Sequence, residues 1–83
     1  MTENEILSRV TGVFRGVFAN QNLTLSSTTT AQDVKGWDSL MHINLIVAIE
    51  KEFKIRFTTR EINSLRNVGD LLNLVARKSG ASS

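Results

Sequence analysis

The chain has 83 residues, of which 41% are hydrophobic, and a formal net charge of +2. A domain of this length buries only about 60–65% of its unfolded surface, which makes a deep enclosed enzyme cleft hard to build. The absence of cysteine excludes disulfides and thiolate sites, and a single histidine excludes a histidine-rich metal cluster. The sequence has no apolar run long enough to span a membrane, and its acidic, polar first residues do not have the pattern of a signal peptide. We therefore expect one cytoplasmic, monomeric domain over residues 1–83, with no metal site and no membrane contact.

Residues 3–19 predict the first helix, because apolar side chains recur on one face at the helical period. Gly12 and Gly16 each weaken such a helix by up to about 1 kcal/mol relative to alanine. Residues 20–37 are rich in Asn, Ser and Thr, which compete with the backbone for hydrogen bonds and predict a long loop. The apolar side chains expected to pin this loop to the core are Leu23, Leu25 and Val34.

Residues 39–53 predict the second helix, and its apolar side chains fall on two nearly opposite faces. The longer face, which should pack into the core, comprises Leu45, Ile46, Ile49 and Phe53, with His42 among them. A surface helix in a small bundle needs only one apolar face. The second face therefore either packs against the third helix and the long loop or is presented to a partner. Its residues are Leu40, Ile43 and Val47.

Two shorter helices are predicted in the rest of the chain. Residues 58–65 form the third, and Thr58 followed by Glu61 has the pattern of a capping box at its start. Residues 68–78 form the fourth, with apolar side chains at helical spacing and Asn67 as the N-cap.

The fold class and the charge pattern follow from these elements. No segment has the pattern of a β-hairpin, and residues 79–83 resemble a frayed tail, so we predict an all-α fold: a small four-helix bundle with a long first loop and a short third helix. Residues 1–50 carry three basic and five acidic side chains, whereas residues 51–83 carry seven basic and three acidic ones. Because the basic residues form no run and have no interleaved aromatics, we expect solvated faces, or a surface for an acidic partner, rather than nucleic-acid binding.

Ser39 stands between Asp38 and Leu40, where the second helix begins. An aspartate at this position is well suited to cap the helix, which leaves the serine hydroxyl exposed on the first helical residue. Nucleophilic attack is disfavoured, because His42 is at best a neighbour on the next turn and GWDSL is not the G-x-S-x-G elbow. We therefore predict no catalytic residue and place His42 at the core edge or in solvent. Attachment is the other use of this hydroxyl, since a phosphodiester is favoured at a helix N-terminus.

Three segments, GWDSL, INLIVAIEKEFKIRF and EINSLRNVGDLLNLV, resemble the acyl carrier proteins and their peptidyl and aminoacyl carrier relatives. The motif resemblance runs from about residue 33 to 76, and the order of the predicted helices agrees with that family. The triplet DSL alone is a weak match. Trp37 before it, AIEKEF at residues 48–53 and VGDL at residues 68–71 together make the resemblance specific.

The resemblance implies that Ser39 receives a 4′-phosphopantetheine arm from coenzyme A and that the thiol of this arm carries an acyl group as a thioester. Trp37, Asp38 and Leu40 would then flank the attachment site. The implied partners are a phosphopantetheinyl transferase and the enzymes that load and transfer the acyl group. Because such carriers dock through the start of the second helix, the implied partner-binding residues are Leu40, Met41, Ile43, Asn44, Val47 and Lys51.

The second helix departs from the family in its charge. Many acyl carriers have acidic residues along this helix, whereas here only Glu50 and Glu52 are acidic. The region that follows is basic, with Arg56, Arg60 and Arg66. We therefore expect a carrier for a dedicated pathway, in fatty-acid, polyketide or related biosynthesis, whose partner contacts are more apolar or reversed in charge. The alternative is an unmodified helical interaction module in which Ser39 is only a helix-cap residue.

Overall fold

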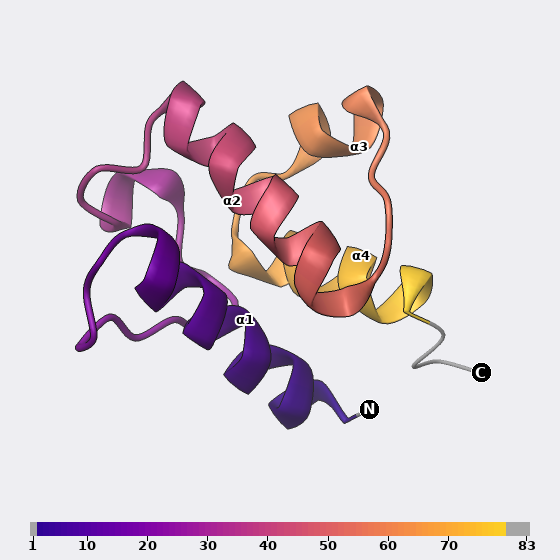
Figure 1. The fold of residues 1–83 in the computed structure, drawn as a ribbon, viewed down its shortest axis with the longest axis horizontal. Helices are drawn as coiled ribbons and strands as arrows, with labels where there is room; N and C mark the ends of the chain where they lie inside the picture. The colour runs from indigo at the N-terminus through magenta and orange to yellow at the C-terminus, as the bar shows by residue number, and fades with distance from the viewer. Residues whose placement is uncertain (1, 80–83) are drawn as a thin grey trace.

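The computed structural model describes residues 2–79, and all regular secondary structure in this range is helical. In this range the chain forms α1 (Glu3–Val17), the 3-10 turn η1 (Ala31–Asp33), α2 (Ser39–Phe53), α3 (Thr59–Ser64) and α4 (Val68–Lys78) (Figure 1). These elements confirm the predicted all-α fold of four helices with a long first loop and a short third helix. Of the predicted tail, Ser79 is the C-cap of α4, and residues 80–83 lie outside the described residues.

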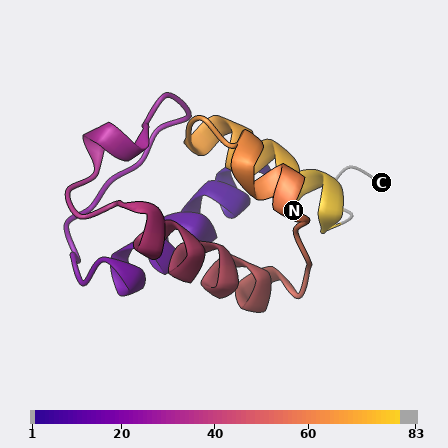
Figure 2. The same cartoon turned by 90° about the horizontal axis from the view of Figure 1, so that it is seen from above.

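The core lies between α1, α2 and α4, while α3 stands at the edge of the bundle (Figures 1 and 2). The longer face of α2 packs inward as predicted, and α3 contributes no fully buried side chain. No helix among residues 2–79 has both the length and the apolar character needed to cross a membrane. The buried apolar side chains are Ile6, Val10, Phe14, Val34, Leu45, Ile46, Ile49, Phe53, Ile55, Val68, Leu71, Leu74 and Val75.

Side-chain hydrogen bonds confirm the predicted N-terminal caps of α2, α3 and α4, although α3 spans Thr59–Ser64 rather than residues 58–65. The carboxylate of Asp38 accepts a hydrogen bond from the backbone N–H of Met41 at the start of α2. The amide oxygen of Asn67 accepts one from the backbone N–H of Asp70 at the start of α4. Thr58 and Glu61 form the expected reciprocal capping box at α3. Side-chain caps of this kind satisfy backbone donors that the helix itself leaves unpaired.

The first helix ends earlier than predicted, at Val17 instead of residue 19. Ala19 adopts a left-handed backbone conformation with φ of 52°, and the N–H of Asn20 donates to the carbonyl of Arg15 at 3.0 Å. This is the hydrogen bond of a Schellman motif, which usually has glycine at the left-handed position. Because no glycine marks this position, the apolar pattern of the sequence continues to Phe18, one residue beyond the end of the helix.

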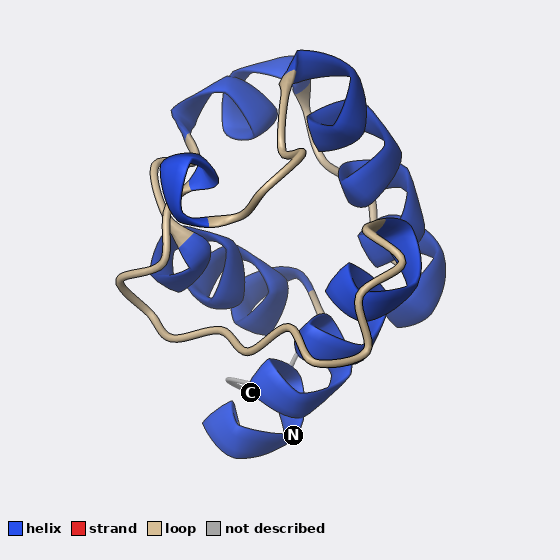
Figure 3. Ribbon diagram, turned by 90° about the vertical axis from the view of Figure 1, so that its left-hand side faces the viewer, coloured by secondary structure: helices blue, strands red, loops and turns tan. Residues whose placement is uncertain are grey.

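The long first loop is ordered by its packing and by its contacts with α4. Val34 is buried, and Leu23 and Leu25 pack against the core as predicted. The 3-10 turn η1, which the sequence analysis missed, interrupts this connection. The loop carbonyls also accept hydrogen bonds from the first amides of α4, with the N–H of Val68 donating to the carbonyl of Thr29 at 2.8 Å, so the middle of the loop (tan in Figure 3) is fixed to the start of α4.

Candidate functional site

Ser39 is the first residue of α2, and its side chain is exposed. The preceding Asp38 has extended backbone geometry and caps the helix, with its Oδ1 2.9 Å from the backbone nitrogen of Met41. The Ser39 hydroxyl makes no hydrogen bond to any residue in the described range. The cap and the hydroxyl therefore belong to different residues, as the sequence predicted.

The N-terminus of α2 favours negative charge close to Ser39. The helix has 15 residues, and the backbone amides of Ser39 and Leu40 have no acceptor among residues 2–79. Unpaired first-turn amides and the positive end of the helix dipole together stabilise an anion. A phosphodiester on the Ser39 oxygen would carry its charge within reach of these groups, so the site fits a phosphopantetheine attachment.

Trp37, which lies two residues before Ser39, packs against α1 and so holds the end of the long loop in place. Its indole ring meets Phe14 edge-on at a centroid distance of 5.2 Å and lies 6.1 Å from Phe18. Its N–H donates to Nδ1 of His42 at 3.1 Å, and the two rings stack at 5.9 Å. His42 is therefore half-buried at the core edge, one of the two positions that the sequence allowed.

A cleft of about 440 Å³ opens beside Ser39, between α2 and α3. The apolar part of its wall includes Trp37, Ile43 and Ile62. Its polar part includes Asn63, Arg66 and Asn67, which were not predicted from the sequence to belong to the site. Within residues 2–79 no cluster of three or more metal-ligating side chains occurs. The full set of lining residues is Ala31, Trp37, Asp38, Ser39, His42, Ile43, Ile62, Asn63, Leu65, Arg66, Asn67 and Leu71.

The second apolar face of α2 is exposed along its length. The solvent-exposed fractions are 71% for Leu40, 51% for Ile43 and 43% for Val47. The sequence left open whether this face packs against α3 and the long loop. In the structure, such packing leaves much of the face exposed to solvent. Asn44 and Lys51 are also exposed, whereas Met41 is half-buried with its sulfur 3.8 Å from the Asn44 amide nitrogen.

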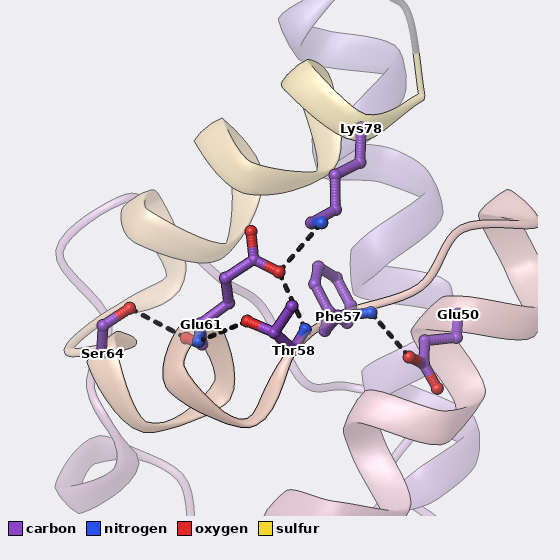
Figure 4. Close-up of polar contacts among 6 residues, drawn as sticks. All are labelled: Glu50, Phe57, Thr58, Glu61, Ser64 and Lys78. Atoms are coloured by element: carbon purple, nitrogen blue, oxygen red, sulfur yellow. Dashed lines mark hydrogen bonds and ion pairs between the residues drawn. The ribbon is translucent and has the colours of Figure 1, made fainter.

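Polar contacts hold α3 in place (Figure 4). Glu61 accepts from the backbone N–H of Thr58 and forms an ion pair with Lys78 of α4 at 2.9 Å. The hydrogen bond from Thr58, followed by the contact with Lys78, holds the pKa of Glu61 below its ordinary value of 4.5. On the other side, the backbone N–H of Phe57 donates to the carboxylate of Glu50 at 2.8 Å.

Comparison with known proteins identifies the family. A family model described as the phosphopantetheine attachment site matches residues 5–75. The mitochondrial acyl carrier protein of Saccharomyces cerevisiae is 30% identical over 86 residues, covering 99% of this chain and 69% of that protein. An acyl carrier protein homolog of Mycoplasma genitalium is 32% identical over 84 residues, covering 94% of this chain and 98% of that protein.

The fold is also that of a solved family member. The solution NMR structure of holo acyl carrier protein from Geobacter metallireducens superimposes with a TM-score of 0.85 and is 43% identical, covering 92% of this chain and 87% of that one. The description of the family model agrees with the fit of the site to a phosphodiester, and the solved structure agrees with the helical fold. The chain therefore belongs to the acyl carrier protein family, whose members bear a covalent 4′-phosphopantetheine and act as carriers rather than as enzymes.

Proposed function

We propose that Ser39 bears the 4′-phosphopantetheine arm and that the chain presents acyl thioesters on it to partner enzymes. The observation that carries this proposal is the exposed Ser39 hydroxyl at the capped N-terminus of α2, inside the family match of residues 5–75. When bound, the arm supplies a thiol that holds the acyl group. The chain itself contributes the anchoring oxygen, the unpaired amides near it and a rigid helix on which partners can dock.

The attachment proposal is tested by modification in vitro. Purified protein is incubated with coenzyme A, Mg²⁺ and a broad-specificity phosphopantetheinyl transferase, and its intact mass is measured. Wild type and Ser8→Ala, a control for an exposed serine within a helix, should each gain one phosphopantetheine, whereas Ser39→Ala should gain none. A gain on Ser39→Ala would contradict the assignment, and absence of any gain would favour the unmodified interaction module.

The exposed apolar face of α2 is the proposed partner surface. Leu40, Ile43 and Val47 lie on the same helix as Ser39, so a protein that docks on this face reaches the attachment point as well. Polar replacement of a docking residue removes apolar contact area without affecting the core. Val47→Asn should therefore slow modification by the transferase severalfold while leaving the thermal unfolding midpoint nearly unchanged. An unchanged rate would contradict the docking role of this face.

The charge of the exposed face of α2 supports the proposal that the carrier serves a dedicated pathway. This face carries Asn44 and Lys51, and the nearby Lys54 and Arg56 are exposed as well. A partner with a basic docking patch gains little attraction from such a surface. A general fatty-acid synthase acyltransferase should therefore load the holo-protein poorly, and added salt should not reduce the rate further. Efficient loading that falls with salt, as expected for an acidic carrier, would contradict this proposal. The cargo class, whether fatty acyl, polyketide or aminoacyl, follows from those partner enzymes.

A further inference from the structure

Three residues from separate segments form a hydrogen-bonded bridge across the cleft beside Ser39. The indole N–H of Trp37 meets Nδ1 of His42 at 3.1 Å, and Nε2 of His42 lies 3.4 Å from the backbone carbonyl oxygen of Ile62. All three residues line the cleft. Because Trp37 also packs against Phe14, the bridge connects α1 to α3 through the imidazole of α2.

The bridge determines where the imidazole carries its proton. An indole N–H can only donate, so Nδ1 of His42 must accept. The neutral ring then has its proton on Nε2, which faces the Ile62 carbonyl and can donate to it. Trp37 therefore selects the tautomer that lets His42 contact α3, and the stacking of the two rings fixes the orientation of the imidazole.

The contact matters because α3 stands at the edge of the bundle and its apolar side chain, Ile62, is only half-buried against the core. This helix has six residues and no fully buried side chain. The carbonyl of Ile62 lies in its last turn, where a helix leaves its own acceptors unpaired. A second side-chain contact from α3 to a neighbouring helix is the ion pair of Glu61 with Lys78 of α4, and neither of these two residues lines the cleft. His42 thus caps α3 on the side that forms the cleft wall.

We propose that His42 is a positioning residue that keeps α3 closed against α2, so that the cleft beside Ser39 retains its shape and shelters the attached arm. The inference rests on the proposed function only where it concerns the arm. The cleft volume of about 440 Å³ lies in the range of small-molecule sites, and its wall combines apolar side chains with amides that suit an amide-containing chain.

The first test uses the unmodified protein and is independent of attachment. His42→Phe keeps an aromatic ring but removes both hydrogen bonds, whereas His42→Gln supplies one acceptor and one donor in their place. Hydrogen exchange of the α3 amides should accelerate by about 3- to 10-fold in His42→Phe, the factor expected from one hydrogen bond, and should return toward wild type in His42→Gln. Trp37→Phe, which removes the indole donor but keeps an aromatic ring and the contact of His42 with Ile62, should give a smaller acceleration.

The second test uses the holo-protein, whose only thiol is that of the arm because the chain contains no cysteine. Its reaction rate with N-ethylmaleimide should be lower than that of free pantetheine in wild type, should rise in His42→Phe, and should recover in His42→Gln. Equal exchange in wild type and His42→Phe, or equal loosening in the Phe and Gln variants, would overturn the positioning role. Loosened α3 with unchanged thiol reactivity would overturn the sheltering role. If Ser39 accepts no arm, the proposed function fails while the exchange comparison still decides the role of His42.

Discussion

At the scale of single residues, the site separates two roles between neighbours in sequence. Asp38 stabilises the start of α2 through its hydrogen bond to the N–H of Met41, while the hydroxyl of Ser39 has no structural partner in the described range. An attachment residue must keep its oxygen available, so a separate cap allows the helix to begin at the proposed attachment residue without competing for its oxygen.

Alanine substitutions at these two positions should therefore differ in their effect on stability. Asp38→Ala should lower the free energy of unfolding by about 1 kcal/mol, within the range of 0.5–2 kcal/mol measured for lost N-caps. Ser39→Ala should change it by less than about 0.5 kcal/mol, as for an exposed residue without partners. Urea denaturation of the unmodified proteins measures both. A larger loss for Ser39→Ala than for Asp38→Ala would show that the serine is itself the cap.

Some side-chain roles could be predicted from the sequence because they depend on local spacing. The caps Asp38, Thr58 and Asn67 each precede an apolar helical pattern, and the structure confirms all three. The contact between Trp37 and His42 could not be predicted, because the two residues are five positions apart across a loop-to-helix boundary. The group that orients the imidazole of His42 is the indole N–H of Trp37, a partner that no local spacing rule indicates.

At the scale of elements, two helices contain glycines in opposite environments. A Cβ added at Gly12 of α1 would have nothing within 4 Å. A Cβ added at Gly69 of α4 would lie 2.8 Å from the carbonyl oxygen of Ser27, the same oxygen that accepts the Gly69 N–H. The close approach of the long loop to α4 thus requires glycine at position 69 but not at position 12.

Replacing each glycine with alanine should change stability in opposite directions. Gly12→Ala should raise the free energy of unfolding by up to about 1 kcal/mol, because alanine is the better helix former and space is available. Gly69→Ala should lower it by about 1–3 kcal/mol, the usual cost of overpacking against a fixed backbone atom. Thermal unfolding at one pH gives both signs, and stabilisation by Gly69→Ala would contradict the described loop packing.

The contacts that hold α3 against α4 should depend on pH through the carboxyl group of Glu61. Its pKa is lowered in the folded protein, so its ionised form contributes stability that is present above 4.5 and is lost as the pH falls through the lowered folded value. An NMR titration of the Glu61 carboxyl should give a pKa below 4.5, and Lys78→Met should raise it while leaving the hydrogen bond from Thr58. A wild-type pKa at or above 4.5 would show that these contacts do not form in solution.

At the scale of the whole molecule, the helix order was predictable because each helix has its own apolar period. The start and end of α2 and α4 match the prediction at each residue. The two apolar faces of α2 were also visible in the sequence, since they follow from helical spacing alone. The exposure of Leu40 could not be predicted with them, because it depends on how far α3 extends over α2.

The cleft is the part of the site that sequence patterns could not reveal. Its walls come from η1, α2, α3 and the start of α4, and residues such as Ala31, Arg66 and Leu71 meet only through the tertiary fold. Helical periodicity describes one element at a time, and even Leu71, which belongs to the VGDL segment, gave no sign in the sequence that it would line the cleft with Ala31 and Arg66. The attachment motif marks one point of the site, and the packing of the bundle determines the remainder.

The central claim is that the arm is attached to Ser39, and a peptide-level mass measurement tests it most directly. Cleavage after lysine produces a peptide of residues 36–51 in which Ser39 is the only hydroxyl-bearing side chain. After incubation with coenzyme A and the transferase, this peptide should carry one phosphopantetheine, and every other peptide should keep its unmodified mass. An unmodified 36–51 peptide beside a modified serine or threonine elsewhere would contradict the claim.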